Sequence, residues 1–324
     1  MAVAIGRRGL VLGGAMALAC SRSGRADGSP VPSVSSPNVK LLEWDFGPQP
    51  WGRARAVVVV PQFSGSSVVA PAPTGGGVSV GPDASLAPAR FPVLVALHGR
   101  GEAVKAPADG AMGWPRDYAM VRAIDRLRAP PLKATDYEGL VEPARLAETN
   151  ASLSARPFAG LIVVCPWMPD VHPAATADIS DYTRFVLEVL LPRVRAETPA
   201  LTSSESTGID GVSLGGVEAL RIGLGHPEAF GAVGGIQPAV SDLPSSDWVA
   251  LAAAARSKRP GLKLHLLTSH EDYFHDSVTG VSRAWAAAGI AHDFADVVGP
   301  HDYVFNRGPG SIELLLWHDR ALAR

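Results

Sequence analysis

The chain has 324 residues, which is enough for one large domain or about two of average size. Its formal net charge is −2, and it carries no dense block of Lys and Arg beyond the first few residues, which argues against a nucleic-acid partner. Hydrophobic residues make up 47% of the chain, so we expect a folded globular protein.

Residues 1–20 have the pattern of an export signal. Arg7 and Arg8 precede an apolar run over Gly9–Ala19, which is shorter than the about 20 residues that a membrane-spanning helix needs. The paired arginines resemble a twin-arginine signal, and "MALAC" resembles a bacterial lipobox with Cys20 as the lipidated residue. Ordinary signal-peptidase cleavage before Cys20 is the alternative. We expect an exported protein, periplasmic or in the cell envelope, lipid-anchored through Cys20 or otherwise secreted.

A Ser/Pro/Gly-rich stretch over residues 21–38 predicts a flexible linker, and the folded domain is expected over 39–324. Cys165, in "LIVVCPW", is expected in a buried strand. If Cys20 carries lipid, the chain has no second thiol for an intramolecular disulfide.

The domain opens with two strand-like runs, "VKLLEWDF" and "RARAVVVVPQ", which predict an antiparallel pair. A Gly/Pro-rich loop follows at 64–90. The continuous apolar runs at 91–101 and 159–167 are typical of strands buried on both faces of a parallel sheet. The segment 102–158 between them is longer than one crossover helix needs, so we expect it to include a cap or a substrate-facing insertion.

The remainder of the chain alternates between helix and strand patterns. Residues 177–198 predict a helix with one apolar face, and a strand around Ile209 leads through Ser213 into another helix. Further strands are expected in "AVGGIQPAV", "LKLHLLTS" and "HDFADVV", and further helices in "SDWVALAAAARSK", "VTGVSRAWAAAG" and "SIELLLWHDRALA". This alternation predicts an α/β fold with a mostly parallel, doubly wound sheet and helices on both faces.

The pattern G-x-S-x-G occurs twice, around Ser79 and around Ser213. A reactive serine of this type needs a strand before it and a helix after it, because the sharp turn between them lifts the hydroxyl above the sheet edge. Ser79 lies in the Gly/Pro-rich loop with no helix pattern behind it, whereas Ser213 has both neighbours. Ser213 is therefore the candidate nucleophile.

A serine hydroxyl needs a base to take its proton and a carboxylate to orient that base. His301 follows the last predicted strand, in "VVGPHDYVF", and is the candidate base. Asp272 follows the preceding strand, in "TSHED", and is the preferred carboxylate. Glu271 and Asp276 are alternatives, and Asp242 is a more remote one.

The oxyanion that forms on acyl transfer needs hydrogen-bond donors. "LHGRG" after a buried strand offers the backbone N–H of Arg100, and the N–H of Leu214 follows the nucleophile. The segment "HEDYFH", His270 to His275, differs from the zinc motif H-E-x-x-H because its histidines are five residues apart and follow a strand. We expect no metal and no cofactor.

The motifs "LHGRG", "IDGVSLGG", "TSHED" and "GPHDYVFNRGPG" resemble those of the α/β-hydrolase superfamily, in its order Ser, Asp, His. Within it, the chain is similar to serine esterases such as esterase D, feruloyl esterases, enterochelin esterases and polyhydroxyalkanoate depolymerases. The resemblance covers about residues 39–324. It implies a carboxylic-ester hydrolase that forms an acyl-enzyme on Ser213 and acts on a small-molecule, carbohydrate or polymer ester. The alternatives are a serine peptidase of the same fold and a catalytically inactive surface binding protein.

Overall fold

A computed structural model describes residues 34–63, 89–171 and 179–324 of the chain. These residues all belong to one compact unit, Pro32–Arg324. The predicted export signal, most of the predicted linker and nearly all of the loop at 64–90, with Ser79, lie outside the described residues. The expectations for those segments therefore stay predictions.

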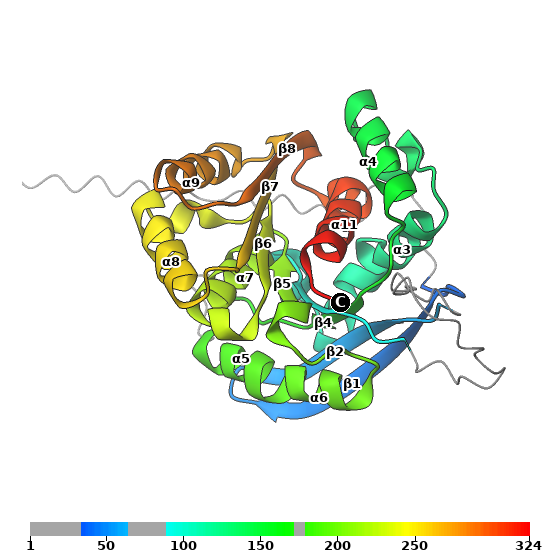
Figure 1. The fold of residues 1–324 in the computed structure, drawn as a ribbon. Helices are drawn as coiled ribbons and strands as arrows, with labels where there is room; N and C mark the ends of the chain where they lie inside the picture. The colour runs from blue at the N-terminus through cyan, green and yellow to red at the C-terminus, as the bar shows by residue number, and fades with distance from the viewer. Residues whose placement is uncertain (1–33, 64–88, 172–178) are drawn as a thin grey trace, which may run out of the picture. The chain divides into compact units, whose positions relative to one another are not determined.

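In the described part of the chain, eight strands form one sheet in the order β1-β2-β4-β3-β5-β6-β7-β8 (Figure 1). β2 is antiparallel to both β1 and β4, and from β4 to β8 all neighbours are parallel. The mostly parallel sheet and its antiparallel opening pair are thereby confirmed. The strands are β1 Val39–Gln49, β2 Gly52–Pro61, β3 Val93–Leu97, β4 Ile162–Pro166, β5 Thr207–Gly211, β6 Ala232–Ile236, β7 Lys263–Glu271 and β8 Asp293–Pro300.

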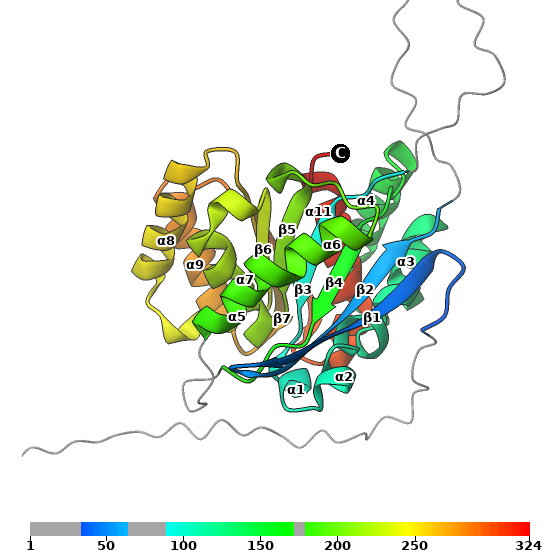
Figure 2. The same ribbon diagram turned by 90° about the horizontal axis from the view of Figure 1, so that it is seen from below.

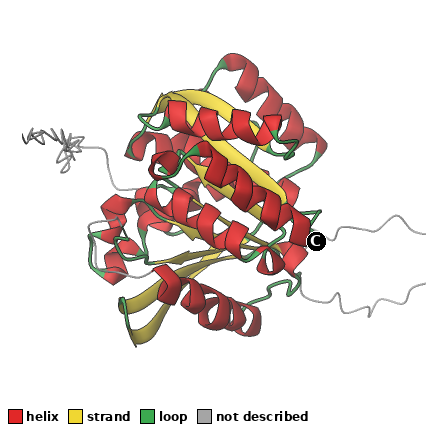
Figure 3. Cartoon of the chain, turned by 90° about the vertical axis from the view of Figure 1, so that its left-hand side faces the viewer, coloured by secondary structure: helices red, strands yellow, loops and turns green. Residues whose placement is uncertain are grey.

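Helices cover both faces of this sheet (Figures 1 and 2), and Figure 3 shows them layered over the strands. One face carries α5 to α9, and the other carries α3, α4 and α11. None of the helices within the described ranges has the length and apolar character needed to span a membrane. Their bounds are α1 Arg100–Ala103, α2 Pro107–Gly110, α3 Met120–Arg128, α4 Pro143–Ala155, α5 Ile179–Phe185, α6 Leu191–Glu197, α7 Leu214–Gly225, α8 Ser245–Lys258, α9 His275–Ala287, α10 Tyr303–Phe305 and α11 Ser311–Ala321.

The central strand β3 explains why its sequence is a continuous apolar run. Val93, Val95 and Leu97 join the hydrophobic core under α5 to α9, and the two residues between them join the core under α3 and α11. Every residue of β3 is buried, since successive side chains point to opposite faces and both faces are covered. Cys165 lies buried in β4, as expected, and burial raises the pKa of its thiol.

The predicted helix over 177–198 is interrupted where the sequence carries a proline. Val186–Leu190 forms a π-helical turn between α5 and α6, and the Leu191 N–H donates to the Val186 carbonyl. Pro192 has no N–H to continue the α-helical pattern, and its ring crowds the carbonyl one turn earlier. The wider turn accommodates this proline while the apolar face continues against the sheet.

The long segment between β3 and β4 contains α1 to α4. α3 buries Met120, Val121, Ala123, Ile124 and Leu127 and packs against α11 in the core on that face of the sheet. α4 buries only Thr149 and Leu153. The expectation that part of 102–158 faces the substrate stays a prediction.

Candidate active site

Ser213 lies on the sharp turn between β5 and α7. Its backbone has φ 58° and ψ −117°, a conformation that costs a residue other than glycine of order 1–3 kcal/mol and persists only when its surroundings enforce it. The turn is held by two backbone bonds: the Ser213 N–H donates to the Ile236 carbonyl at 3.0 Å, and the Ala239 N–H donates to the Ser213 carbonyl at 3.1 Å.

Two glycines allow this turn to form. A Cβ on Gly211 would lie 2.5 Å from the Gly215 carbonyl oxygen and 2.6 Å from the Leu97 carbonyl oxygen. A Cβ on Gly215 would overlap the carbonyl oxygens of Leu97 and His98. Both glycines of the G-x-S-x-G pattern are therefore needed so that β3, β5 and the start of α7 can approach closely.

His301 and Asp272 are brought together at the carboxyl ends of β8 and β7. The His301 Nδ1 lies 2.8 Å from Asp272 Oδ1, and the Asp272 side chain is fully buried. Asp272 also accepts from the Thr268 hydroxyl at 2.8 Å and from the Phe274 N–H at 2.9 Å. Because a carboxylate only accepts hydrogen bonds, Nδ1 carries the imidazole proton and Nε2 is left as the basic nitrogen.

The alternative carboxylates lie elsewhere. Glu271 is exposed, Asp276 contacts His275 at 3.3 Å, and Asp242 pairs with Arg221 on the surface. Of the four candidates from the sequence, Asp272 is the one with a hydrogen bond to His301.

Gln237 links the Ser213 turn to the His301 loop, and sequence reasoning did not identify it. It follows Ile236, whose carbonyl holds the Ser213 N–H, and its own Nε2 donates to Ser269 Oγ at 2.6 Å and to the Pro300 carbonyl at 3.1 Å. Its side chain is fully buried and its φ is 42°. The only sequence signal was a polar residue at the end of an otherwise apolar strand.

Two aromatic rings flank the imidazole of His301. The Tyr273 ring centroid lies 4.2 Å from it and the Phe274 centroid 5.5 Å, so the ring is held between its Asp272 bond and these neighbours. Tyr273 is 67% exposed, which places an accessible aromatic surface beside the candidate base.

The "LHGRG" segment lies against Ser213 from the side of β3. A Cβ on Gly99 would lie 3.7 Å from Ser213 Cβ, which fits the close approach that this glycine allows. Arg100 and Leu214 are the first residues of α1 and α7, where backbone N–H groups point outward along the helix axis. The Arg100 side chain is engaged separately, with its Nε 2.9 Å from Asp170 Oδ2.

His98 fixes the start of this segment as a neutral imidazole. Its Nε2 accepts from the Met168 N–H at 2.9 Å, so the proton is on Nδ1, which donates to the Gly99 carbonyl at 2.9 Å. Burial lowers the pKa of His98, which agrees with a neutral ring.

His270 and His275 both approach one carboxylate, Asp296, at 3.7 Å and 2.9 Å. The hydrogen bond that His275 donates to Asp296 raises the pKa of His275. Across the described residues, no group of three or more His, Cys, Asp or Glu side chains is placed to hold a metal ion.

A second buried histidine–carboxylate pair is formed by His318 and Asp210, the residue before Gly211. His318 Nε2 lies 3.0 Å from Asp210 Oδ2, and His265 Nδ1 lies 3.6 Å from the same oxygen. Both side chains of the Asp210–His318 pair are fully buried. This pair was not predicted from the sequence, in which the only signal was a carboxylate inside an apolar strand.

Residues 167–289 match the esterase family model, a span that includes Ser213 and Asp272. No curated protein matches the sequence. The chain is similar in structure to a ferulic acid esterase, at 15% identity and TM-score 0.62, over 88% of this chain and 99% of that one.

It is also similar to an S-formylglutathione hydrolase from Staphylococcus aureus, at 14% identity and TM-score 0.55, over 87% of this chain and 99% of that one. An enterobactin esterase from Shigella flexneri matches at 18% identity and TM-score 0.52, over 87% of this chain and 60% of that one. These likenesses show a shared α/β-hydrolase fold. The match of residues 167–289 to the esterase family model, together with this fold, supports an ester hydrolase.

Proposed function

We propose that this protein is an ester hydrolase that works through an acyl-enzyme on Ser213, with His301 as the general base and Asp272 as the residue that orients it. The observation that carries the proposal is the 2.8 Å bond between His301 Nδ1 and the buried Asp272. Ser213 follows β5, and the bonded pair follows β7 and β8, so all three residues lie after the carboxyl ends of parallel strands.

In the first half of the reaction, His301 Nε2 takes the Ser213 hydroxyl proton as Oγ bonds to the ester carbonyl carbon. The carbonyl oxygen becomes an oxyanion, which accepts from the N–H groups of Arg100 and Leu214. The bond to the leaving alcohol then breaks, and His301 returns the proton to the alcohol oxygen. Water repeats the sequence on the acyl-enzyme and releases the acid.

The substrate that we propose is an ester of a small molecule, a carbohydrate or a polymer. The names of similar structures, which include a ferulic acid esterase and an enterobactin esterase, support this class. The exposed Tyr273 ring beside His301 also favours an ester with an apolar or aromatic portion. A series of p-nitrophenyl esters of increasing acyl length, beside a feruloyl ester and a short peptide, tests the class. Cleavage of the peptide but of none of the esters would favour a peptidase instead.

Asp272→Asn and Glu271→Gln form a matched pair that tests the catalytic assignment. Asn cannot hold the imidazole in the tautomer that accepts the serine proton, so we expect kcat to fall about 1,000-fold or more. Glu271 is adjacent but exposed and is expected to tolerate the change within about twofold. Steady-state kinetics on a p-nitrophenyl ester measures both. Unchanged kcat in Asp272→Asn would remove Asp272 from the mechanism.

We also propose that the protein is exported and that lipid on Cys20 anchors it, on the basis of the pattern in residues 1–20. Replacing both Arg7 and Arg8 by Lys should keep the full chain in the cytoplasm. Cys20→Ser should release it from the membrane fraction while leaving it exported. Fractionation of expressing bacterial cells measures both outcomes, and a wild-type chain found in the cytoplasm would contradict the proposal.

A further inference from the structure

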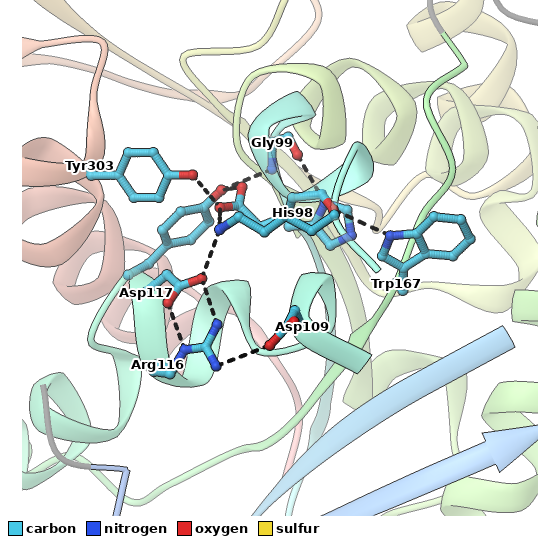
Figure 4. Close-up of polar contacts among 10 residues, drawn as sticks. His98, Gly99, Asp109, Arg116, Asp117, Trp167 and Tyr303 are labelled. Atoms are coloured by element: carbon cyan, nitrogen blue, oxygen red, sulfur yellow. Dashed lines mark hydrogen bonds and ion pairs between the residues drawn. The ribbon is translucent and has the colours of Figure 1, made fainter. Parts of the chain in front are cut away.

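Glu102 is a buried carboxylate in α1 that the proposed mechanism does not use. It is 1% exposed, and its Oε1 accepts from the Tyr303 hydroxyl at 2.6 Å and from Lys105 Nζ at 3.2 Å. Its Oε2 accepts from the Tyr118 hydroxyl. Figure 4 shows this set of polar contacts, with Tyr303 approaching from one side and His98 and Gly99 from the other. Burying a carboxylate costs free energy unless donors are paired with it in this way. Glu102 therefore holds its partners in place, and they hold Glu102 in place.

Through Tyr118, Glu102 fixes the N–H of Gly99. A phenol has a single proton, and in Tyr118 this proton is donated to Glu102. The phenol oxygen is therefore free to accept the Gly99 N–H, at 3.2 Å. Burial first, and then the charge of Glu102, raise the pKa of Tyr118 well above its usual range, so the phenol keeps its proton.

The other side of Gly99 is fixed as well. Its carbonyl accepts from His98 Nδ1 at 2.9 Å and from the backbone N–H of Glu102 at 3.2 Å. In a planar trans peptide the C=O and the following N–H point in opposite directions. With the Gly99 carbonyl turned toward His98 and Glu102, the Arg100 N–H is turned away from them. Glu102 thus helps set the direction of the donor proposed for the oxyanion in two ways: its main-chain N–H binds the Gly99 carbonyl directly, and its side chain holds the Gly99 N–H through Tyr118.

The same carboxylate reaches the loop of the candidate base. Tyr303 begins α10, two residues after His301, and its hydroxyl is bound to Glu102. A Cβ on Gly101 would lie 2.8 Å from the Tyr303 hydroxyl oxygen, so this glycine lets the two loops meet. Tyr118 and Tyr303 also pack together, with ring centroids 5.6 Å apart.

Glu102 is one end of a row of ion pairs in which negative and positive side chains alternate. Lys105 bridges Glu102 and Asp117, with Nζ 3.0 Å from Asp117 Oδ2, and Arg116 Nε lies 2.7 Å from Asp117 Oδ1 (Figure 4). Burial disfavours the Lys105 ammonium, but the carboxylates of Glu102 and Asp117 outweigh it and raise its pKa. A cation therefore stays beside Glu102 at neutral pH.

We propose that Glu102 is a positioning residue for ester hydrolysis: through Tyr118 it holds the His98–Gly99 peptide, which directly precedes the Arg100 N–H, and through Tyr303 it holds the His301 loop. The inference rests on the proposed function of Arg100 and His301. It requires that Glu102 affect the transition state, in which the oxyanion exists, much more than it affects binding of the ground-state ester.

The test compares Glu102→Gln, Tyr118→Phe and Tyr303→Phe with wild type on a p-nitrophenyl ester. We expect kcat to fall about 10- to 100-fold in Glu102→Gln and Tyr118→Phe, with KM within about threefold of wild type. Tyr303→Phe should cause a smaller fall, because it leaves the Gly99 contact intact. Affinity for a trifluoromethyl ketone analogue, which forms a tetrahedral oxyanion on the serine, should fall in parallel with kcat/KM.

Glu313→Gln and Tyr137→Phe are the matched controls. Glu313 is also a buried carboxylate, paired with Arg145 at 2.5 Å, and Tyr137 is also a buried phenol, bonded to Thr149 at 3.3 Å. These variants should lose thermal stability as the test variants do and keep wild-type kcat.

Three outcomes separate the possibilities. If Glu102→Gln and Tyr118→Phe lose stability like the controls but keep kcat, the inference is overturned. If Glu102→Gln does not fold, Tyr118→Phe, which removes one oxygen atom, decides by the same criterion. If wild type neither hydrolyses esters nor reacts with the ketone at Ser213, the proposed function fails and the inference fails with it.

Discussion

The backbone of Ser213 is strained, and the cost of this strain in stability can be measured separately from catalysis. Its φ of 58° and ψ of −117° suit glycine better than any residue with a Cβ. The neighbours that enforce this conformation are the carbonyl of Ile236, the last residue of β6, and the N–H of Ala239, which follows β6. Ser213→Ala therefore removes the hydroxyl and keeps the strain, whereas Ser213→Gly removes both.

Ser213→Gly and Ser213→Ala should both abolish ester hydrolysis but should differ in stability. Ala keeps the Cβ and its strain, whereas Gly relieves the strain and gives back part of the gain as unfolded-state entropy. We expect Ser213→Gly to have the larger free energy of unfolding, by about 1 kcal/mol. Urea unfolding of both proteins measures this difference. Equal stability would mean that the turn stores little strain.

The candidate residues that could be chosen from the sequence are those that directly follow a strand. Ser213, Asp272 and His301 each follow a recognisable strand, so their shared edge could be expected from the parallel sheet. Gln237 and Glu102 were not predicted, because their contacts join segments that are far apart in the chain. No local pattern in the sequence encodes those contacts.

At the scale of elements, the turn from β5 into α7 depends on glycines that lack room for any side chain. Gly215, in the first turn of α7, approaches the end of β3, whereas Gly225, the last residue of α7, has no atom within 4 Å of an added Cβ. Packing therefore requires glycine at position 215 but not at position 225 of the same helix.

Gly215→Ala should destabilise the protein by about 2 kcal/mol or more and remove activity, because the Cβ would force β3 and α7 apart. Gly225→Ala should leave kcat unchanged and raise stability by about 0.5 kcal/mol through helix propensity. Thermal unfolding and ester hydrolysis on the two variants measure these effects. A stable, active Gly215→Ala protein would refute the close packing described for the turn.

The periodicity of apolar residues predicted where most elements lie, because that pattern reflects which face is buried. It did not predict the π-helical turn at Val186–Leu190, since the apolar face continues through it. The position of Pro192 was the available signal, but it marks a disturbance without fixing its form. The packing of α3 against α11 is a tertiary contact that only the structure supplies.

At the scale of the whole molecule, buried histidines couple folding to pH. Burial lowers the pKa of both His98 and His318, and Asp210 only partly offsets this for His318. Between the lowered folded-state pKa and the ordinary value of about 6.5, the unfolded chain binds a proton that the folded chain does not. The contribution of these two histidines to the free energy of unfolding is fully present above about pH 6.5, and it is lost as the pH falls through the folded-state pKa.

We therefore expect the unfolding temperature to fall from pH 7 to pH 5. Each neutral histidine contributes a slope of at most about 1.4 kcal/mol per pH unit. His318→Gln should be less stable at pH 7 and show a shallower decline, because one of the two groups is gone. Calorimetry across this range tests the effect, and an identical slope in His318→Gln would assign the pH dependence to other groups.

The most direct test of the central claim is covalent labelling with a fluorophosphonate probe, followed by peptide mapping. We predict one adduct, on Ser213, that is absent from folded Ser213→Ala and forms much more slowly in His301→Ala. An adduct on another serine, or no adduct on a folded protein that hydrolyses esters, would contradict it.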